Sequence, residues 1–167
     1  MRDTIDPIPD ENIWQVDTNQ RVPIPLFGSA VSAGFGNPAE THIEQRLNLQ
    51  DLCVEHVDTT YFVFVEGDSM INDEIRPGTI LVVDSSIPIS TGDIVVGWVN
   101  GDCFVKRFVR SGKMITLFPS NPDYLPIYVH PEVDQFKVLG KVTHFVSKPK
   151  KWSQEELLAA KDHVRTR

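Results

Sequence analysis

Short runs of alternating apolar residues dominate the second half of the chain. From residue 61 onward these runs are rich in β-branched and aromatic residues, and turn signals such as Pro-Gly, Thr-Gly and Asn-Gly separate them. The runs cover residues 61–66, 79–84, 93–99, 103–109, 114–118 and 136–146. Short strands at this spacing, without long helices between them, predict a mainly β fold with a single twisted, barrel-like domain. The Asn100-Gly101 pair predicts a hairpin between the third run and the fourth.

The region before these runs has a different pattern. Residues 1–38 contain several prolines and few periodic apolar positions, which predicts an extended arm. Residues 39–56 place apolar side chains about one helical turn apart, so they predict a short helix, or two helices divided near Asn48. We therefore expect an arm at 1–38 and a β-rich domain at 39–146.

A basic amphipathic helix is expected at the C-terminal end, over residues 147–167. Ser153 and Glu156 have the spacing of a capping box, and Leu157 and Val164 recur at helical spacing. Such a helix more often packs on its own domain or on a partner subunit than on nucleic acid. The sequence does not assign it a role.

Overall charge and hydropathy argue against several classes of function. A formal net charge of −7 disfavours a protein whose main task is to coat nucleic acid. The arm at 1–38 is also too short for a helix-turn-helix headpiece, so we expect no sequence-specific DNA binding. No apolar run approaches the ~18–20 residues that span a bilayer, and the acidic N-terminus is not typical of a signal peptide. We expect a cytoplasmic protein without membrane contact.

The cysteines and histidines do not form a recognisable ligand set. Cys53 and Cys103 each lie in an apolar run without CxxC spacing, so we expect small buried side chains rather than a disulfide or metal ligands. The five histidines are scattered along the chain. The sequence therefore predicts neither a metal site nor a cofactor.

Two side chains in the β region could perform chemistry together. Ser69 follows Gly67-Asp68 at the end of a predicted strand, where a serine is typically a helix N-cap. Lys106 shares one strand face with Phe104 and Phe108, so it is either an ordinary edge-strand lysine or a partly desolvated one. Desolvation lowers the pKa of a lysine, and a neutral lysine can activate a serine nucleophile. Ser69 and Lys106 are therefore a candidate Ser–Lys pair.

The segment FGSAVSAGFG, at residues 27–36, is uncharged and rich in small residues. Its composition alone is typical of a linker. It fits neither the Walker pattern, which needs a lysine after the last glycine, nor the dinucleotide-binding pattern. Small residues would also let the chain enter a catalytic groove as an extended strand, so the segment is a candidate substrate.

Several stretches resemble the LexA/UmuD family of self-cleaving Ser–Lys peptidase domains. They are FVEGDSM at 64–70, IRPGTILVVDSSIPISTGDIV at 75–95 and GDIVVGWVNGDCFVKRF at 92–108, and the resemblance covers roughly residues 24–146. The short arm and the stretch ETHIEQRLNLQDL at 40–52 make the chain most similar to UmuD-type members, the accessory subunits of error-prone polymerases.

The resemblance implies a role for each matching residue. Ser69 would be the nucleophile and Lys106 the general base. The backbone N–H groups of Asp68 and Ser69 would stabilise the oxyanion, and the scissile bond would join Ala33 to Gly34.

The resemblance also implies a process and partners. It predicts a homodimer of the DNA-damage (SOS) response, whose self-cleavage is stimulated by a RecA filament on single-stranded DNA. The truncated form would then join a UmuC-like polymerase subunit in translesion DNA synthesis. An alternative stays open, namely a non-cleaving, LexA-like dimerisation module that regulates transcription or a polymerase. Two other classes are disfavoured. A signal peptidase-like enzyme would need a membrane anchor, and a repressor would need a DNA-binding headpiece, and the sequence predicts neither.

Overall fold

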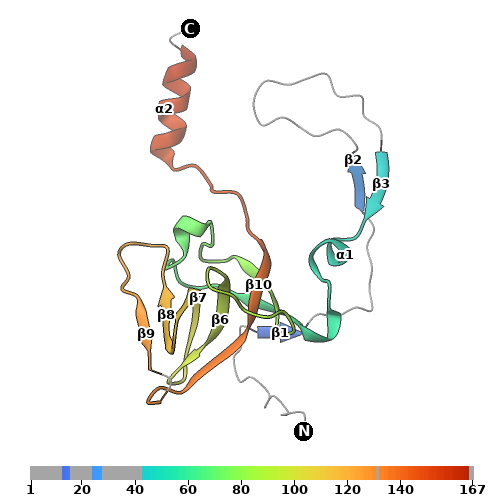
Figure 1. The fold of residues 1–167 in the computed structure, drawn as a ribbon. Coiled ribbons are helices and arrows are strands. Elements are labelled where there is room, and N and C mark those ends of the chain that lie inside the picture. The colour runs from blue at the N-terminus through green and yellow to red at the C-terminus, as the bar shows by residue number, and fades with distance from the viewer. Residues whose placement is uncertain (1–12, 16–23, 28–42, 131, 166–167) are drawn as a thin grey trace.

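An eight-stranded antiparallel sheet forms the centre of the molecule (Figure 1), with strand order β1-β4-β5-β10-β6-β7-β8-β9. The computed structural model describes residues 13–15, 24–27, 43–130 and 132–165. The strands of this sheet are β1 (Ile13–Gln15), β4 (Thr60–Phe64), β5 (Ile80–Asp84), β6 (Ile94–Val99), β7 (Asp102–Ser111), β8 (Met114–Phe118), β9 (Ile127–Val129) and β10 (Phe136–Val146). The predicted mainly β fold is confirmed, and each of the six predicted strands has its counterpart.

The Asn-Gly hairpin is confirmed between β6 and β7. Asn100 and Gly101 have φ angles of 53° and 93°, so both central residues lie in the left-handed region that a type I′ turn requires. The turn brings Val99 opposite Asp102 and sets the register of the two strands. This register places Lys106 of β7 opposite Val95 of β6.

Strand β10 joins the two halves of the sheet, because it pairs with β5 on one side and with β6 on the other. The register shifts within each of these pairings, and such bulges increase local bending and twist. Gly140 lies in the bent part, where an added Cβ would come within 2.4 Å of the Asp84 carbonyl oxygen. A side chain at this position would push β10 away from β5.

Two hydrophobic clusters form the core on either side of the candidate site. One surrounds β4, β5 and β10, and includes Met70 and Ile75 from the segment after β4. The other gathers side chains of β6 to β9, including Phe104 and Phe108 of β7. The turn that carries Ser69 is therefore anchored in one cluster by Met70, whereas the phenylalanines that flank Lys106 belong to the other.

The helical prediction for residues 39–56 is wrong in its first half. Ile43–Leu47 is strand β3, which pairs with β2 (Ile24–Phe27) in a separate two-stranded sheet. Ile43 and Leu47 have helical spacing, but a stretch this short adopts the strand conformation when a partner strand supplies its backbone hydrogen bonds. A break at Asn48 is confirmed, since its Oδ1 accepts from the Gln50 N–H (3.2 Å) as the N-cap of helix α1 (Leu49–Cys53).

The prediction that both cysteines are buried is also wrong. Cys103 is exposed, because it lies next to the start of β7 and strand alternation directs it away from the face of Phe104. Cys53 is half-buried at the end of α1, a helix without a fully buried residue. Neither cysteine forms a disulfide.

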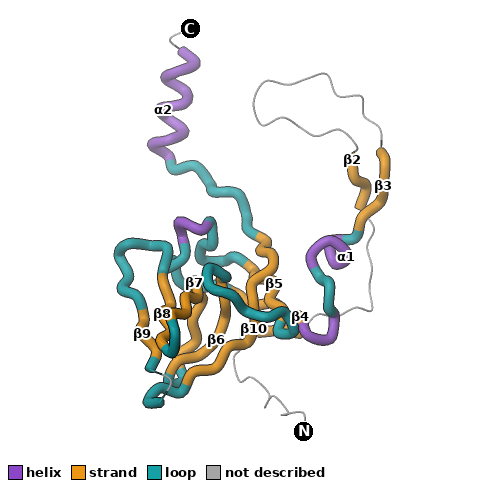
Figure 2. The backbone as a smooth tube through the Cα atoms, in the orientation of Figure 1, coloured by secondary structure: helices purple, strands orange, loops and turns teal. Residues whose placement is uncertain are grey.

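The predicted C-terminal helix is confirmed as α2 (Gln154–Arg165), and it extends away from the sheet (Figures 1 and 2). Its capping box is formed: the Glu156 N–H donates to Ser153 Oγ, and the Ser153 N–H donates to the Glu156 carboxylate. Leu157 and Leu158 are exposed, so these side chains are not packed on the protein's own sheet. The boundaries at 38/39 and 146/147 stay predictions.

None of the helices in the described parts of the chain is long and apolar enough to cross a membrane. The first residues of the predicted arm, and the proposed scissile bond between Ala33 and Gly34, lie outside the described residues. Two short pieces of the predicted arm are described. They are the strands β1, paired with β4, and β2, paired with β3.

Candidate active site

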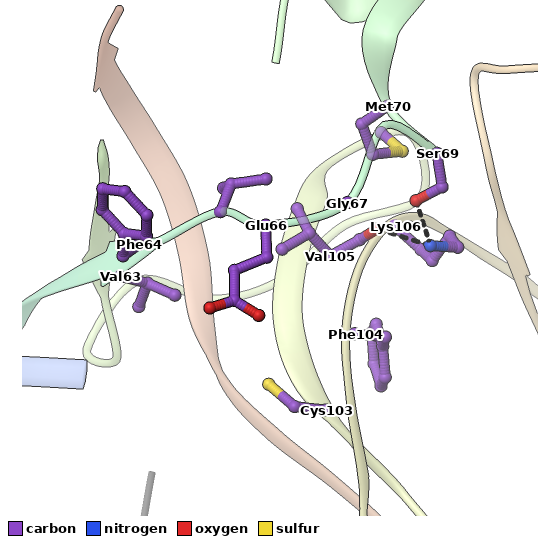
Figure 3. A pocket seen from close by; sticks show the side chains of 11 residues that line it. Val63, Phe64, Glu66, Gly67, Ser69, Met70, Cys103, Phe104, Val105 and Lys106 are labelled. Atoms are coloured by element: carbon purple, nitrogen blue, oxygen red, sulfur yellow. Dashed lines mark hydrogen bonds between the residues drawn. The ribbon is translucent and has the colours of Figure 1, made fainter. Parts of the chain in front are cut away.

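Ser69 and Lys106 are brought together by the fold, as the sequence predicted. Lys106 Nζ lies 2.6 Å from Ser69 Oγ, and the two form a hydrogen bond (Figure 3). Ser69 lies in the turn between β4 and a short 3-10 helix, η2 (Ile71–Asp73), whereas Lys106 lies in the middle of β7. Two segments that are distant in sequence thus bring a hydroxyl and an amine to one point.

The surroundings of Lys106 favour its neutral form. The residue is only 9% exposed, between the equally buried Phe104 and Phe108 on the same strand face. Its other hydrogen bond goes to the carbonyl oxygen of Val105 (3.0 Å), and no carboxylate pairs with it among the described residues. Burial therefore lowers the pKa of Lys106, because the ammonium loses hydration without gaining a counter-charge. A lysine with a lowered pKa can accept a proton from a serine.

Ser69 is not a helix cap, which was the ordinary interpretation of a serine at this position. The N-cap of η2 is Met70, and no side-chain hydrogen bond caps the helix. The Ser69 hydroxyl is therefore not committed to backbone capping. It faces the amine of Lys106.

The backbone N–H groups of Asp68 and Ser69, the predicted oxyanion donors, donate to no acceptor among the described residues. The carbonyl groups of the same two residues do have partners. The Ser69 carbonyl accepts from the N–H groups of Ser120 and Asn121, and the Asp68 carbonyl accepts from the Ile71 N–H and from Asn121 Nδ2. In the described structure the N–H groups of this turn are thus available to a substrate, whereas its carbonyl groups are held by hydrogen bonds.

Ser120 and Asn121, in the loop between β8 and β9, were not predicted as site residues from the sequence. Asn-Pro after a strand is a turn signal, so a loop at this position could have been predicted. The contact with the Ser69 turn could not, because the two segments lie about 50 residues apart and local patterns carry no information about that distance.

A groove of about 230 Å³ runs past the Ser–Lys pair (Figure 3). Its walls are the end of β4 with the residues that follow, and the first half of β7. They are lined by Val63, Phe64, Val65, Glu66, Gly67, Ser69, Met70, Cys103, Phe104, Val105 and Lys106. The lining is mainly apolar, and so the groove suits an extended peptide with small apolar side chains.

Comparison with known proteins agrees with this geometry. Residues 25–143 match the model of the Peptidase S24-like family. The chain is 39% identical to Protein MucA of Salmonella typhimurium over 121 residues, which are 72% of this chain and 82% of that protein. It is 36% identical to Protein SamA of Salmonella typhimurium strain LT2 over 124 residues, 74% of this chain and 85% of that protein.

A repressor is also among the relatives. LexA repressor 1 of Geobacter sulfurreducens is 35% identical over 125 residues, which are 75% of this chain and 61% of the repressor. These matches confirm the resemblance to the LexA/UmuD family that the motifs indicated. The family match ends at residue 143 and therefore does not include α2.

Proposed function

We propose that this chain, which belongs to the Peptidase S24-like family, is a serine peptidase that cuts its own backbone between Ala33 and Gly34. One observation carries the proposal: the 2.6 Å hydrogen bond between Ser69 Oγ and the Nζ of a buried lysine. A buried amine without a carboxylate partner has a lowered pKa, so it can act as a general base, unlike a surface lysine that stays charged. The groove beside it has the apolar lining that the small residues at 27–36 would fill.

The proposed reaction begins with neutral Lys106. Ser69 Oγ attacks the carbonyl carbon of Ala33 as Lys106 Nζ takes the hydroxyl proton. The backbone N–H groups of Asp68 and Ser69 stabilise the negative charge that develops on the carbonyl oxygen. The bond to the Gly34 nitrogen then breaks, and Lys106 returns the proton to the departing amine. Water, deprotonated by Lys106, finally releases Ala33 as a carboxylate and restores Ser69.

Carrying the substrate on the same chain makes strong binding unnecessary. A tethered segment has a high effective concentration at the groove, so apolar contacts of small side chains are sufficient. The groove has one exposed carboxylate, Glu66, and the segment 27–36 has no charge that must be matched to it.

We propose that this cleavage serves the DNA-damage (SOS) response. The likeness to LexA/UmuD-type proteins supports a homodimer in the cytoplasm whose cleavage is promoted by a RecA filament on single-stranded DNA. The filament would act by favouring the arrangement in which the segment occupies the groove. The shortened chain, from Gly34 onward, would then bind an error-prone, UmuC-like polymerase subunit.

The test is the intact mass of the purified protein after incubation from neutral to alkaline pH. We expect a fragment that begins at Gly34, formed faster as the pH rises, because deprotonation of Lys106 produces the active base. A rate that does not change with pH, or cleavage by a Ser69→Ala variant, would contradict the proposal. A second incubation, with RecA, ATP and single-stranded DNA, tests the stimulation. If the chain stays intact in both, it is a non-cleaving dimerisation module.

A further inference from the structure

The loop between β8 and β9 is bonded directly to the turn that carries Ser69. The Ser120 and Asn121 N–H groups both donate to the Ser69 carbonyl oxygen, each at a distance of 3.0 Å. Asn121 Nδ2 donates to the Asp68 carbonyl oxygen at a distance of 3.3 Å, and the Tyr124 hydroxyl donates to the Asp68 carboxylate. Four hydrogen bonds from one loop therefore end on the nucleophile and on the residue before it.

Asn121 is the centre of this contact. It is only 7% exposed, and each of its hydrogen-bonding groups toward the loop and the turn is used. Its N–H and Nδ2 donate to the turn, while its Oδ1 accepts from the Asp123 N–H over 3.1 Å and keeps the loop in shape. A buried polar side chain with all these bonds has one orientation, because any other would leave a buried group unpaired.

Peptide geometry converts these bonds into a direction for the Ser69 N–H. The Asp68 carbonyl and the Ser69 N–H belong to one planar trans peptide, so they point in opposite directions. Fixing the carbonyl against Asn121 therefore aims the N–H to the other side. That N–H is one of the predicted oxyanion donors, and it has no acceptor among the described residues.

The same reasoning fixes the hydroxyl. The peptide after Ser69 is held through its carbonyl by two donors, and the peptide before it is held through the Asp68 carbonyl. With both flanking peptide planes fixed, the backbone angles of Ser69 are fixed, and so is the direction of its Cβ. From this Cβ, one side-chain rotamer brings Oγ to 2.6 Å from Lys106 Nζ, and the hydrogen bond between the two atoms holds that rotamer. The Asn121 bond also polarises the peptide and strengthens its N–H as a donor.

We infer that Asn121 is a positioning residue of the site: through the Asp68 and Ser69 carbonyls, it orients the nucleophile and the oxyanion-stabilising N–H. This inference rests on the proposed self-cleavage. The residue does not touch the reacting atoms, and it acts only through the peptides on either side of Ser69.

The test compares two asparagines that both bond across this contact. Asn121→Ala removes the bond to the Asp68 carbonyl. Asn72→Ala is the matched control, because Asn72 Nδ2 donates to the Ser120 carbonyl (2.7 Å), on the same loop, but not to the peptides of Ser69. We expect self-cleavage at alkaline pH to slow by about 10- to 100-fold in Asn121→Ala, the usual cost of a misplaced donor or nucleophile. Asn72→Ala should stay within about threefold of the unmodified protein.

A pH profile separates positioning from loosening of the fold. If Asn121 only orients Ser69, the pH of half-maximal rate stays where it is, because Lys106 keeps its apolar surroundings. If the variant merely opens the groove to water, that pH rises toward the value for a free lysine, and the inference is wrong. Equal losses in the two asparagine variants, or an Asn121→Ala rate within twofold of normal, would also overturn it.

Amide hydrogen exchange keeps the inference testable without cleavage. The Ile71 and Ser120 amides donate to the Asp68 and Ser69 carbonyls, and they should exchange at least about tenfold faster in Asn121→Ala than in Asn72→Ala, because the turn opens more often. Unchanged exchange rates would overturn the inference even if the protein cleaves itself. If the unmodified protein does not cleave, the proposed function fails, whereas the exchange rates still decide whether Asn121 holds the turn.

Discussion

Ser69 and Ser153 occupy comparable positions in the chain and have different roles. Each precedes a helical turn, and at each position a serine is typically an N-cap. Ser153 is a cap: its Oγ accepts from the Glu156 N–H over 3.1 Å. Ser69 is not, because its Oγ is bonded to Lys106 and the N-cap of the following turn is Met70.

The two serines differ in the location of the group that forms a hydrogen bond with the hydroxyl. The partner of Ser153 is three residues away on an exposed helix, so the local sequence is sufficient to form the bond. The partner of Ser69 is 37 residues away and buried, so the bond requires the completed sheet. A serine with the cap pattern is therefore an N-cap where the surroundings are exposed, and is available for chemistry where tertiary structure places a base beside it.

The strongest test of this comparison is to remove each hydroxyl in turn. Ser69→Ala should lower the self-cleavage rate by more than about a thousandfold, because no other nucleophile is in place. Ser153→Ala should cleave at the normal rate. Intact mass after alkaline incubation measures both, and a fragment beginning at Gly34 in Ser69→Ala would show that Ser69 is not the nucleophile.

A second prediction concerns the buried partner and pH. Lys106→Met should increase the free energy of unfolding at neutral pH, because an amine that is desolvated without a counter-charge is replaced by an apolar side chain. The gain should shrink as the pH rises toward about 10.4, the ordinary pKa of lysine. In that range the folded protein has lost the proton while the unfolded chain still binds it, so stability of the unmodified protein rises with pH.

Urea denaturation at several pH values measures this change. Lys137→Met, at an exposed position of β10, is the control and should show no such pH-dependent gain. A gain of Lys106→Met that is constant over the whole pH range would mean that Lys106 is not desolvated in the folded protein.

The third prediction concerns the helix cap. Ser153→Ala should destabilise α2 by about 1 kcal/mol, because the Glu156 N–H loses its acceptor. Helical circular dichroism should fall, with no change in the urea midpoint of the β domain, since Leu157 and Leu158 are exposed. A shifted midpoint would mean that α2 is packed on the sheet in solution.

The smallest expected effect is that of deleting residues 148–167. This segment follows β10 and lies beyond the family match, and none of its described side chains lines the groove. The self-cleavage rate of the shortened protein should therefore stay within about twofold of normal. A larger loss, measured by intact mass, would assign α2 a role in presenting the segment.

The sheet was predictable from the sequence where local signals were sufficient. Six strands and the Asn100-Gly101 turn follow from alternation and from the φ angles that the turn requires. Strand β9 was missed, because three residues are too few for an alternation pattern. Ile43–Leu47 was predicted as helix because the spacing of its ends fits both structures, and only pairing with β2 decides between them.

The site was predictable in part for the same reason. Ser69 and Lys106 were found from motifs and from the apolar neighbours of the lysine, and the structure brings them together. Asn121 was missed because its importance lies in one contact with a distant turn. Cys103 was predicted as buried since its run is apolar, although its position near the strand start exposes it.

The bonds between the β8–β9 loop and the Ser69 turn also set a time order. A ribosome releases the proposed scissile bond first, then Ser69, then Lys106, and Asn121 only later. Because β10 pairs with both β5 and β6, the sheet closes only after residue 146 has emerged. A nascent chain thus carries the proposed cleavage segment and Ser69 before the site is complete, so the proposed self-cleavage has to wait until the sheet has closed.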